Sequence, residues 1–257
     1  MNFYKAVISY KGTRYQGWQI QPGDELKTVQ GSLNKALSKI SKSSNVRTIG
    51  SGRTDSGVHA FGQVVRIEIP LDINEMGLLK GLNSNLSDDI RVLSLEKSSE
   101  DFHPVFHAKE KEYHYRFTCK EIHSPFTKDL MTTYPYELDF DEMNKACKAF
   151  VGKHDFADFR CVGTDIDNTV REIFDCRIEK IIESSWQSRF NDEYYVLIVR
   201  GSGFLKQMVR LIMGTIWSVG KGRTQVEQIS KALKNPTGNK LGVVAPAEGL
   251  YLIKVDY

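Results

Sequence analysis

The residues best suited to chemistry lie in the loop Gly52-Arg53-Thr54-Asp55-Ser56-Gly57, between two short runs rich in β-branched residues. Asp55 supplies a carboxylate that can act as a nucleophile or as a general base. The glycines of the loop, with Gly62 beyond it, permit backbone conformations that other residues disfavour and let a ligand approach the main chain. Long, glycine-bearing loops on a sheet often carry function. The alternative is a plain hairpin turn, in which Asp55 makes a local hydrogen bond.

Basic residues gather in two stretches of the chain, although the net charge is only +3. The first stretch runs from residue 35 to 66 and contains one acid, Asp55; the second runs from 200 to 223 and contains none. The basic residues are Lys35, Lys39, Lys42, Arg47, Arg53 and Arg66, then Arg200, Lys206, Arg210, Lys221 and Arg223. They form either two solvated faces or the walls of a groove that binds a polyanion.

The composition is that of a globular protein. The 257 residues are 40% hydrophobic and 26% charged, which allows one large domain or two small ones. The chain has no apolar stretch near the roughly 20 residues that span a membrane. Its first residues lack the basic region and cleavage site of a signal peptide. We therefore expect a cytoplasmic protein with no membrane segment.

Metal ligands in a recognisable spacing are missing from the sequence. None of the four cysteines forms a CxxC pair, which argues against both a disulfide scaffold and a structural zinc site. His103 and His107 have the spacing of a helical metal pair, but Pro104 between them disfavours a helix. A Gly-rich nucleotide loop is also missing. We expect no metal and no cofactor.

The elements that must position the loop follow from hydrophobic periodicity. Alternating β-branched and aromatic residues predict strands over Phe3–Tyr10, Val46–Gly50, Gln63–Ile69 and Ile90–Leu95. An apolar face from Val29 to Ile40 predicts a helix after the first strand. Asp72 and Glu75 have capping-box spacing and predict the start of a second helix. The order βαββαβ is typical of ferredoxin-like domains.

The same order recurs in the second half of the chain. Strands are predicted over Tyr113–Cys119, Asp175–Ile182, Tyr194–Arg200 and Leu250–Val255. Three helices are predicted: one after Asp141 that stops at Gly152, a longer one from Phe204 to Val219, and a short one from Thr224 with Glu227 completing its capping box. We therefore predict an α+β fold: two ferredoxin-like lobes, residues 1–104 and 105–257, whose mostly antiparallel sheets form a central cleft.

The loop sequence Gly-Arg-Thr-Asp-Ser-Gly-Val-His, with Gly62-Gln63-Val64 after it, resembles the active-site signature of the tRNA pseudouridine synthase A family. Further blocks resemble that family in order along the chain. They are Tyr10–Gln19, Leu82–Leu86 with Asp89-Ile90, Asp101–His103 with Phe106–Ala108, Met208–Arg210 with Gly214, and Ala245–Leu252. Together they cover nearly the whole chain, which makes the combination far more specific than any one block.

The resemblance implies an isomerase that converts uridine to pseudouridine in tRNA, with Asp55 as its single catalytic carboxylate. The reaction breaks the bond from ribose C1′ to uracil N1 and rejoins the base through C5. No electrons or phosphoryl groups move, so the chemistry calls for no cofactor. Asp55 either attacks C1′ directly or removes a proton from C2′. The sequence supports both routes.

The resemblance also assigns residues around the uridine. Arg210 matches an arginine of the second lobe that lies near the aspartate, where its charge would favour the ionised carboxylate. Tyr113 matches a tyrosine that stacks against the target uracil. From pattern alone, Arg210 is a solvated helix residue and Tyr113 a core strand residue. Arg53 either holds phosphate, helps to displace the base, or anchors the loop.

The implied substrate is the anticodon stem-loop of tRNA, with uridines 38, 39 and 40 as targets and a homodimer that holds one tRNA. A uridine in a stem must flip out of the stack to reach Asp55. RNA helices are recognised mainly through shape and backbone, so neighbouring sequence should be tolerated. Because the segment Lys109–Glu112 is less basic than is usual in the family, we expect Lys42, Arg47 and Lys206 to carry more phosphate contacts.

Three other functions compete with this one. A catalytically silent tRNA-binding protein of the same fold would have lost Asp55, which is present. A nucleoside or glycoside hydrolase usually needs two carboxylates, whereas the loop offers one. A pseudouridine synthase that acts on another RNA fits the chemistry but not the family pattern.

Overall fold

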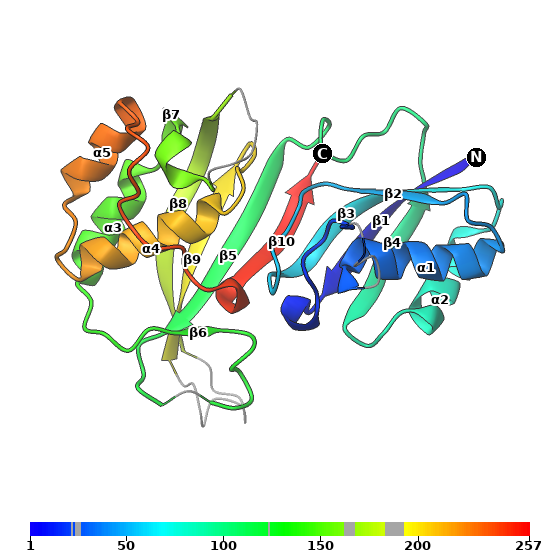
Figure 1. Ribbon diagram of the computed structural model, residues 1–257, viewed down its shortest axis with the longest axis horizontal. Coiled ribbons are helices and arrows are strands. Elements are labelled where there is room, and N and C mark those ends of the chain that lie inside the picture. The colour runs from blue at the N-terminus through cyan, green and yellow to red at the C-terminus, as the bar shows by residue number, and fades with distance from the viewer. Residues whose placement is uncertain (22, 24–26, 123, 162–167, 183–192) are drawn as a thin grey trace. The chain divides into compact units, whose positions relative to one another are not determined.

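The computed structural model describes residues 1–21, 23, 27–122, 124–161, 168–182 and 193–257 (Figure 1). The chain forms two compact units, each built from a sheet and helices. Unit 1 comprises Met1–Lys109 with Tyr251–Tyr257, and unit 2 comprises Glu110–Leu250. The change from one unit to the other thus falls after residue 109, not after 104, and the last residues of the chain belong to unit 1.

Unit 1 has the predicted element order. Its elements are β1 (Asn2–Tyr10), α1 (Val29–Ser41), β2 (Arg47–Gly50), β3 (His59–Ile69), α2 (Glu75–Asn85) and β4 (Ile90–Lys97). The strands lie in the order β4-β1-β3-β2 and all these pairs are antiparallel. The final strand, β10 (Leu250–Asp256), pairs in parallel with the start of β3, where Tyr251 lies opposite His59.

The unit 1 sheet buries one face because apolar residues alternate along its strands. Tyr4, Ala6 and Ile8 of β1 have no exposed surface. The helices α1 and α2 pack against this sheet and against each other (Figure 1). Thr28 caps α1, since its Oγ1 accepts the N–H of Gly31 at 3.1 Å and satisfies one of the unpaired donors of the first turn.

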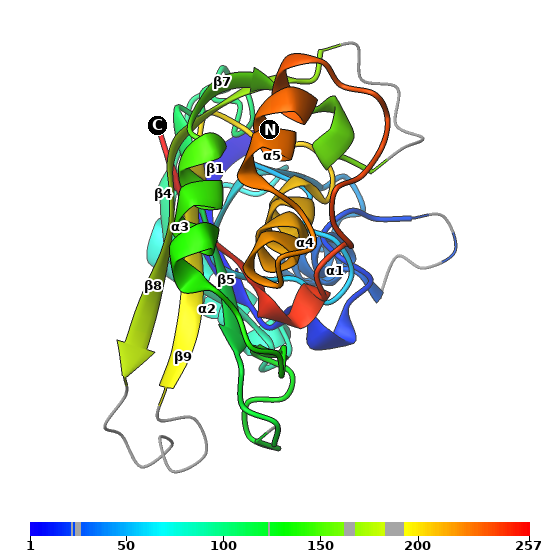
Figure 2. The ribbon, with the colours of Figure 1, turned by 90° about the vertical axis from the view of Figure 1, so that its left-hand side faces the viewer.

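Unit 2 contains more elements than the sequence predicts. They are β5 (Glu110–Thr118), β6 (Thr132–Thr133), α3 (Phe140–Ala149), β7 (Gly152–Asp155), β8 (Val170–Ile182), β9 (Glu193–Gly201), α4 (Met208–Gly220) and α5 (Val226–Lys234). The strands lie in the order β5-β9-β8-β7, and the short β6 pairs with β5. The helices α3, α4 and α5 pack together beside this sheet (Figure 2). The two-residue β6 and four-residue β7 are too short for periodicity to show.

The core of unit 2 forms around α4, which is apolar on nearly every side. All of its thirteen residues are buried except Arg210 and Ser218. Trp217 contacts Tyr115 and Phe117 edge-on, with ring centroids 5.5 Å apart in both pairs. A helix with this composition needs cover from all directions. Arg210, which is partly exposed, is one of the two residues of this helix that are not buried.

Two predicted helix starts in this fold are wrong. Asp72 does not cap α2; the cap is Asn74, whose Oδ1 accepts the N–H of Gly77 at 2.8 Å. Asp72 instead forms an ion pair with Lys97 at 3.0 Å. The helix predicted from Phe204 begins only at Met208, because Gln207 adopts a left-handed backbone with φ of 61°.

Two further helices begin within a few residues of the prediction. The side chain of Asp139 caps α3 by accepting the N–H groups of Asp141 and Glu142, both at 3.0 Å. Helix α5 begins at Val226, and the Gln228 side chain accepts the N–H of Gln225 at 2.7 Å. Glu227 therefore does not complete the capping box. A helix N-terminus with several Asp, Gln and Glu residues offers alternative caps, and only the packed structure selects one.

The fold class is confirmed: the chain is α+β, with largely antiparallel pairing in each unit. In the part of the chain that the structure describes, every helix is too short or too polar to cross a membrane.

Candidate active site

The Asp55 loop connects β2 to β3 in unit 1. Asp55 begins a tight turn, which the Val58 N–H closes by donating to the Asp55 carbonyl at 3.2 Å. Gly57 within this turn has φ of 81°, a backbone conformation that glycine adopts without strain. Thr54 is buried, Asp55 is partly exposed, and Arg53 is exposed. The loop thus holds its aspartate at the surface on a buried support.

The loop is held by the segment that follows β1. The Tyr10 hydroxyl lies 2.9 Å from Thr54 Oγ1, and both groups are buried. The Trp18 N–H donates to the Thr54 carbonyl at 3.1 Å, and the Gly57 N–H donates to the Tyr15 carbonyl at 3.2 Å. These bonds fix the main chain on both sides of Asp55. A carboxylate on such a support keeps its position without reorganisation, as catalysis requires.

Two glycines allow this segment to approach the loop so closely. A Cβ at Gly12 would lie 1.9 Å from the carbonyl oxygen of Val58, which no side chain could tolerate. A Cβ at Gly17 would lie 2.5 Å from the Thr54 carbonyl, and Gly17 also has φ of 95°. The glycines of the block Tyr10–Gln19 are therefore explained by contact with the loop, although that block lies some forty residues earlier.

Two polar side chains of β3 support the Asp55 loop and the neighbouring segment through hydrogen bonds. Gln63 is buried; its Oε1 accepts from the Ser51 hydroxyl at 2.5 Å and its Nε2 donates to the Gly52 carbonyl at 2.7 Å. His59 is also buried and accepts the Gly12 N–H on Nδ1 at 3.1 Å, which assigns the proton of a neutral ring to Nε2. The His59 ring stacks on Tyr251 with centroids 4.6 Å apart.

Sequence reasoning did not assign roles to Tyr10, Thr54, His59 or Gln63. The signal that could have found them is their place inside the blocks that resemble the family. Polar residues on a strand that is otherwise apolar are a second signal, because buried polar groups need partners.

Tyr113 lies on β5 of unit 2. Its side chain is 7% exposed and meets Phe204 edge-on, with ring centroids 5.0 Å apart. Phe204 belongs to the connection between the end of β9 at Gly201 and the start of α4 at Met208. Tyr113 is thus a strand residue at the edge of the packed interior, with one edge contact that orients its ring.

Arg210 is tied to the segment that precedes β10. Its Nε donates to the carbonyl of Ala245 at 2.6 Å, and the Ala245 N–H donates to the carbonyl of Arg210 at 3.1 Å. A guanidinium carries four more N–H groups on its two Nη atoms. The Ala245 bonds therefore fix the direction of a side chain whose N–H groups are of the kind that bind a carboxylate or phosphate.

The C-terminal block Ala245–Leu252 also holds Tyr115, two residues after Tyr113. The Tyr115 hydroxyl donates to the Pro246 carbonyl at 2.9 Å and lies 2.8 Å from Thr132 Oγ1. Burial raises the pKa of Tyr115 well above its usual value, so the phenol stays neutral. Gly249 is required there, because a Cβ would lie 2.7 Å from the Tyr115 ring. This block supports the strand that carries Tyr113.

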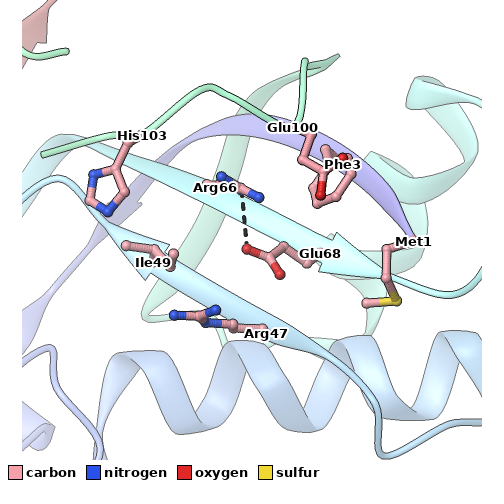
Figure 3. Close-up of a pocket in the computed structure, with 8 residues that line it drawn as sticks. All are labelled: Met1, Phe3, Arg47, Ile49, Arg66, Glu68, Glu100 and His103. Atoms are coloured by element: carbon pink, nitrogen blue, oxygen red, sulfur yellow. Dashed lines mark ion pairs between the residues drawn. The ribbon is translucent and has the colours of Figure 1, made fainter. Parts of the chain in front are cut away.

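A pocket of about 480 Å³ opens on unit 1, lined by Met1, Phe3, Arg47, Ile49, Arg66, Glu68, Glu100 and His103 (Figure 3). Arg66 Nε pairs with Glu68 at 3.1 Å. Burial, and then the charge of Arg66, lower the pKa of His103. Neither Arg53 nor Asp55 lines this pocket. It does contain Arg47, one of the residues from which the sequence predicts phosphate contacts.

The predicted site residues thus divide between the units: Arg53 and Asp55 lie in unit 1, and Tyr113 and Arg210 lie in unit 2. Lys42 and Lys206 are exposed. Within the described ranges, His, Cys, Asp and Glu side chains form no group of three that could hold a metal ion. The four cysteines are free thiols.

The Asp55 loop of unit 1 holds a partly exposed carboxylate on a hydrogen-bonded support, as a reactive or binding group requires. A family model described as tRNA pseudouridine synthase matches residues 6–107 and 146–257. The chain therefore belongs to the tRNA pseudouridine synthase family.

Full-length relatives agree with this assignment. The chain is 41% identical over 258 residues to the tRNA pseudouridine synthase A of Listeria monocytogenes serotype 4a (strain HCC23), and the match covers 100% of both chains. It is 39% identical to the protein of the same name from Bacillus pumilus (strain SAFR-032), over 98% of each chain. With the one from Geobacillus sp. (strain WCH70) it shares 38% identity, over 98% of this chain and 97% of the relative.

Proposed function

We propose that this protein isomerises uridine to pseudouridine at positions 38, 39 and 40 of the tRNA anticodon stem-loop, with Asp55 acting at the ribose. The observation that carries the proposal is the support of the Asp55 turn. Buried Thr54 is bonded to Tyr10 and Trp18, while Asp55 itself stays partly exposed. Family membership supplies the reaction that such a carboxylate would perform.

Two chemical mechanisms account for the bonds that this reaction breaks and forms. In the first, a carboxylate oxygen of Asp55 attacks C1′, the bond to N1 breaks with its electrons on the base, and C5 then displaces the carboxylate. In the second, Asp55 removes the C2′ proton to give a glycal, and the proton returns after C5 has bonded to C1′. In both, C5 loses its proton in the last step and N1, which took the electrons of the broken bond, gains one, so the product is an isomer of uridine.

The other assigned residues have supporting roles in this proposal. Tyr113 stacks against the flipped uracil, and its edge contact with Phe204 supports a fixed ring orientation. Arg210 provides the positive charge that keeps Asp55 ionised, and its bond to Ala245 supports a fixed direction. Arg53, which is exposed at the loop, contacts phosphate or helps to displace the base.

The direct test uses tRNA tritiated at uracil C5. The wild type should release tritium, and Asp55→Asn and Asp55→Ala should release none above background. Asp72→Asn is the matched control, because Asp72 is an exposed acid of unit 1 whose surface ion pair contributes little. Activity in either Asp55 variant would remove Asp55 from its central role. No release by the wild type would favour the silent RNA-binding alternative.

Two follow-up measurements test the finer claims. Mapping pseudouridine in the product should find it only at positions 38, 39 and 40; modification elsewhere would contradict the assigned substrate. Arg210→Lys keeps a charge and should retain more activity than Arg210→Met, which is similar in length but neutral. Equal activities would argue against a role for the charge.

We also propose a homodimer that binds one tRNA, in the cytoplasm where tRNA is found. Sedimentation equilibrium should give twice the chain mass of 29.2 kDa. A stoichiometry of one tRNA per dimer, from titration of labelled tRNA, would support the shared site. A monomer that remains fully active would contradict it.

A further inference from the structure

Two basic side chains from different strands lie at one end of the unit 2 sheet. Lys111 of β5 is opposite Gly201 of β9, and Gly201 is opposite Ile173 of β8. Residues in such a row point to the same face of a sheet. Arg171 is two residues before Ile173 on that face. Strand β9 lies between β5 and β8 (Figure 1). Lys111 and Arg171 therefore flank the end of β9 at which Gly201 lies.

The connection between β9 and α4 passes close to both Arg171 and Tyr113. A Cβ at Gly203 would lie 3.8 Å from both Cδ and Nε of Arg171, so the main chain passes close to that side chain. Phe204, the next residue, is in edge contact with Tyr113 at 5.0 Å. Tyr113 follows Lys111 by two residues on the same face of β5, a separation of about 7 Å along a strand. This separation of Lys111 and Tyr113 is similar in size to one nucleotide of an RNA chain.

Lys111 is buried, whereas Arg171 is partly exposed. Lys111 is 9% exposed, and burial, followed by the charge of Arg171, lowers its pKa to about 8. Burial also lowers the pKa of Arg171. On the opposite face of the sheet, Arg200 already lies 3.6 Å from Glu110 and 3.9 Å from Asp175.

The charge of Arg171 disfavours a second positive charge on buried Lys111, and an anion bound near both would offset this repulsion. Arg171 already uses Nη1 on the carbonyls of Asn168 at 3.0 Å and Val170 at 2.7 Å, which fixes its side chain. An arginine fixed in this way can present its remaining N–H groups to the two oxygens of a phosphate.

We propose that Lys111 and Arg171 form a subsite for one phosphodiester group of the RNA chain, beside the nucleotide that stacks on Tyr113. The proposal rests on the proposed RNA substrate. It assigns a phosphate contact to the segment Lys109–Glu112, from which the sequence predicts only weak ones.

The test measures tRNA binding to Lys111→Gln and Arg171→Gln across a range of salt concentrations. Each variant should weaken Kd about ten-fold and lower the slope of log Kd against log salt by about one, the value for one lost phosphate contact. Lys148→Gln, which neutralises an exposed lysine of α3, is the matched control and should leave both values unchanged. Circular dichroism melts check that each variant is folded.

A pH series separates a phosphate contact from a structural role. Above pH 8 Lys111 loses its proton, so the wild-type Kd should weaken between pH 7 and 9. Lys111→Arg stays charged throughout and should bind with a nearly constant Kd over this range. Arg171, the charged group that acts on Lys111, is present in both proteins and does not titrate there.

The tRNA-binding test of the subsite can fail independently of the tritium assay that tests the proposed function. Unchanged Kd and salt slope in both glutamine variants would overturn the subsite, whatever the tritium assay shows. A Lys111-dependent Kd in a wild type that releases no tritium would uphold the subsite and reject the isomerase. A wild type that does not bind tRNA would reject both.

Discussion

The Tyr10 hydroxyl and the Thr54 Oγ1 lie 2.9 Å apart, both buried, directly beside Asp55. They belong to segments separated by 44 residues, so this single hydrogen bond connects the end of β1 to the Asp55 loop. The position of the carboxylate therefore depends on residues that do not themselves react.

Removing either partner of this bond should lower activity more than stability. A hydrogen bond of this kind contributes about 1 kcal/mol, so Tyr10→Phe and Thr54→Val should each lower kcat roughly five-fold, with little change in KM. The double variant should lose no more than about the larger single loss, because both remove one bond. Tritium release measures this cycle. Tyr4→Phe, on the same strand and also buried, removes a bond to Ile73 away from the loop and should keep full kcat.

Gly12→Ala should destabilise the protein and abolish most activity. The added Cβ would meet the Val58 carbonyl at 1.9 Å, so the loop must move, at a cost of about 1–3 kcal/mol. Gly81→Ala in α2 is the contrast: its Cβ meets only the flexible end of Ile40 at 3.3 Å, and alanine favours the helix by up to about 1 kcal/mol. Thermal melts and the tritium assay compare the two. A Gly12 variant as stable as the Gly81 variant would contradict the close approach.

The two basic stretches should contribute to RNA binding through separate phosphate contacts. Arg47→Gln and Lys206→Gln should each lower the slope of log Kd against log salt by about one. Arg47 lines the unit 1 pocket and Lys206 is an exposed residue of unit 2. Their effects should add, because distant contacts are independent. An unchanged slope in either variant would remove that residue from the RNA surface.

Tyr113→Phe should retain most binding of the flipped uridine, and Tyr113→Leu should not. Stacking needs a flat ring and contributes roughly 1–3 kcal/mol, so the leucine variant should lose about 5- to 150-fold in kcat/KM. Phenylalanine keeps the edge contact with Phe204. If Tyr113→Phe is as inactive as Tyr113→Leu while both fold, the hydroxyl takes part in the chemistry and stacking alone does not explain the residue.

The unfolding free energy should depend on pH through Lys111. Its folded pKa of about 8 is below the unfolded value of about 10.4, so the folded state binds the proton more weakly. Stability should therefore rise by at most about 3 kcal/mol as the pH increases from 8 to about 10.4, and it should stay at its lower level below pH 8, where both states hold the proton. Lys111→Met should lack this rise. Because other groups titrate in the same window, the measurement is the difference between the two proteins in urea unfolding at each pH.

Many secondary-structure elements of this protein depend on residues that are close together in the sequence, and the sequence alone determined these elements. Alternation along Phe3–Tyr10 and the apolar face from Val29 to Ile40 predict their elements because strand and helix periodicity are properties of neighbouring residues. The order of these elements also predicts the fold class. The blocks that resemble the family identify the Asp55 loop. Helix starts were less predictable, since Asp72 and Asn74 are both good caps and only tertiary packing distinguishes them.

Tertiary structure alone decided what surrounds each chemical group. Packing of segments that are far apart in the sequence creates the contact of Gly12 with Val58. It also creates the hydrogen bonds of His59 and Gln63. The row Lys111–Gly201–Ile173 depends on the register of three strands. Register has no local signature, because a one-residue shift leaves each strand's own pattern intact while it turns every side chain to the other face. For that reason only the register of the sheet identifies Lys111 and Arg171 as a basic pair next to Tyr113.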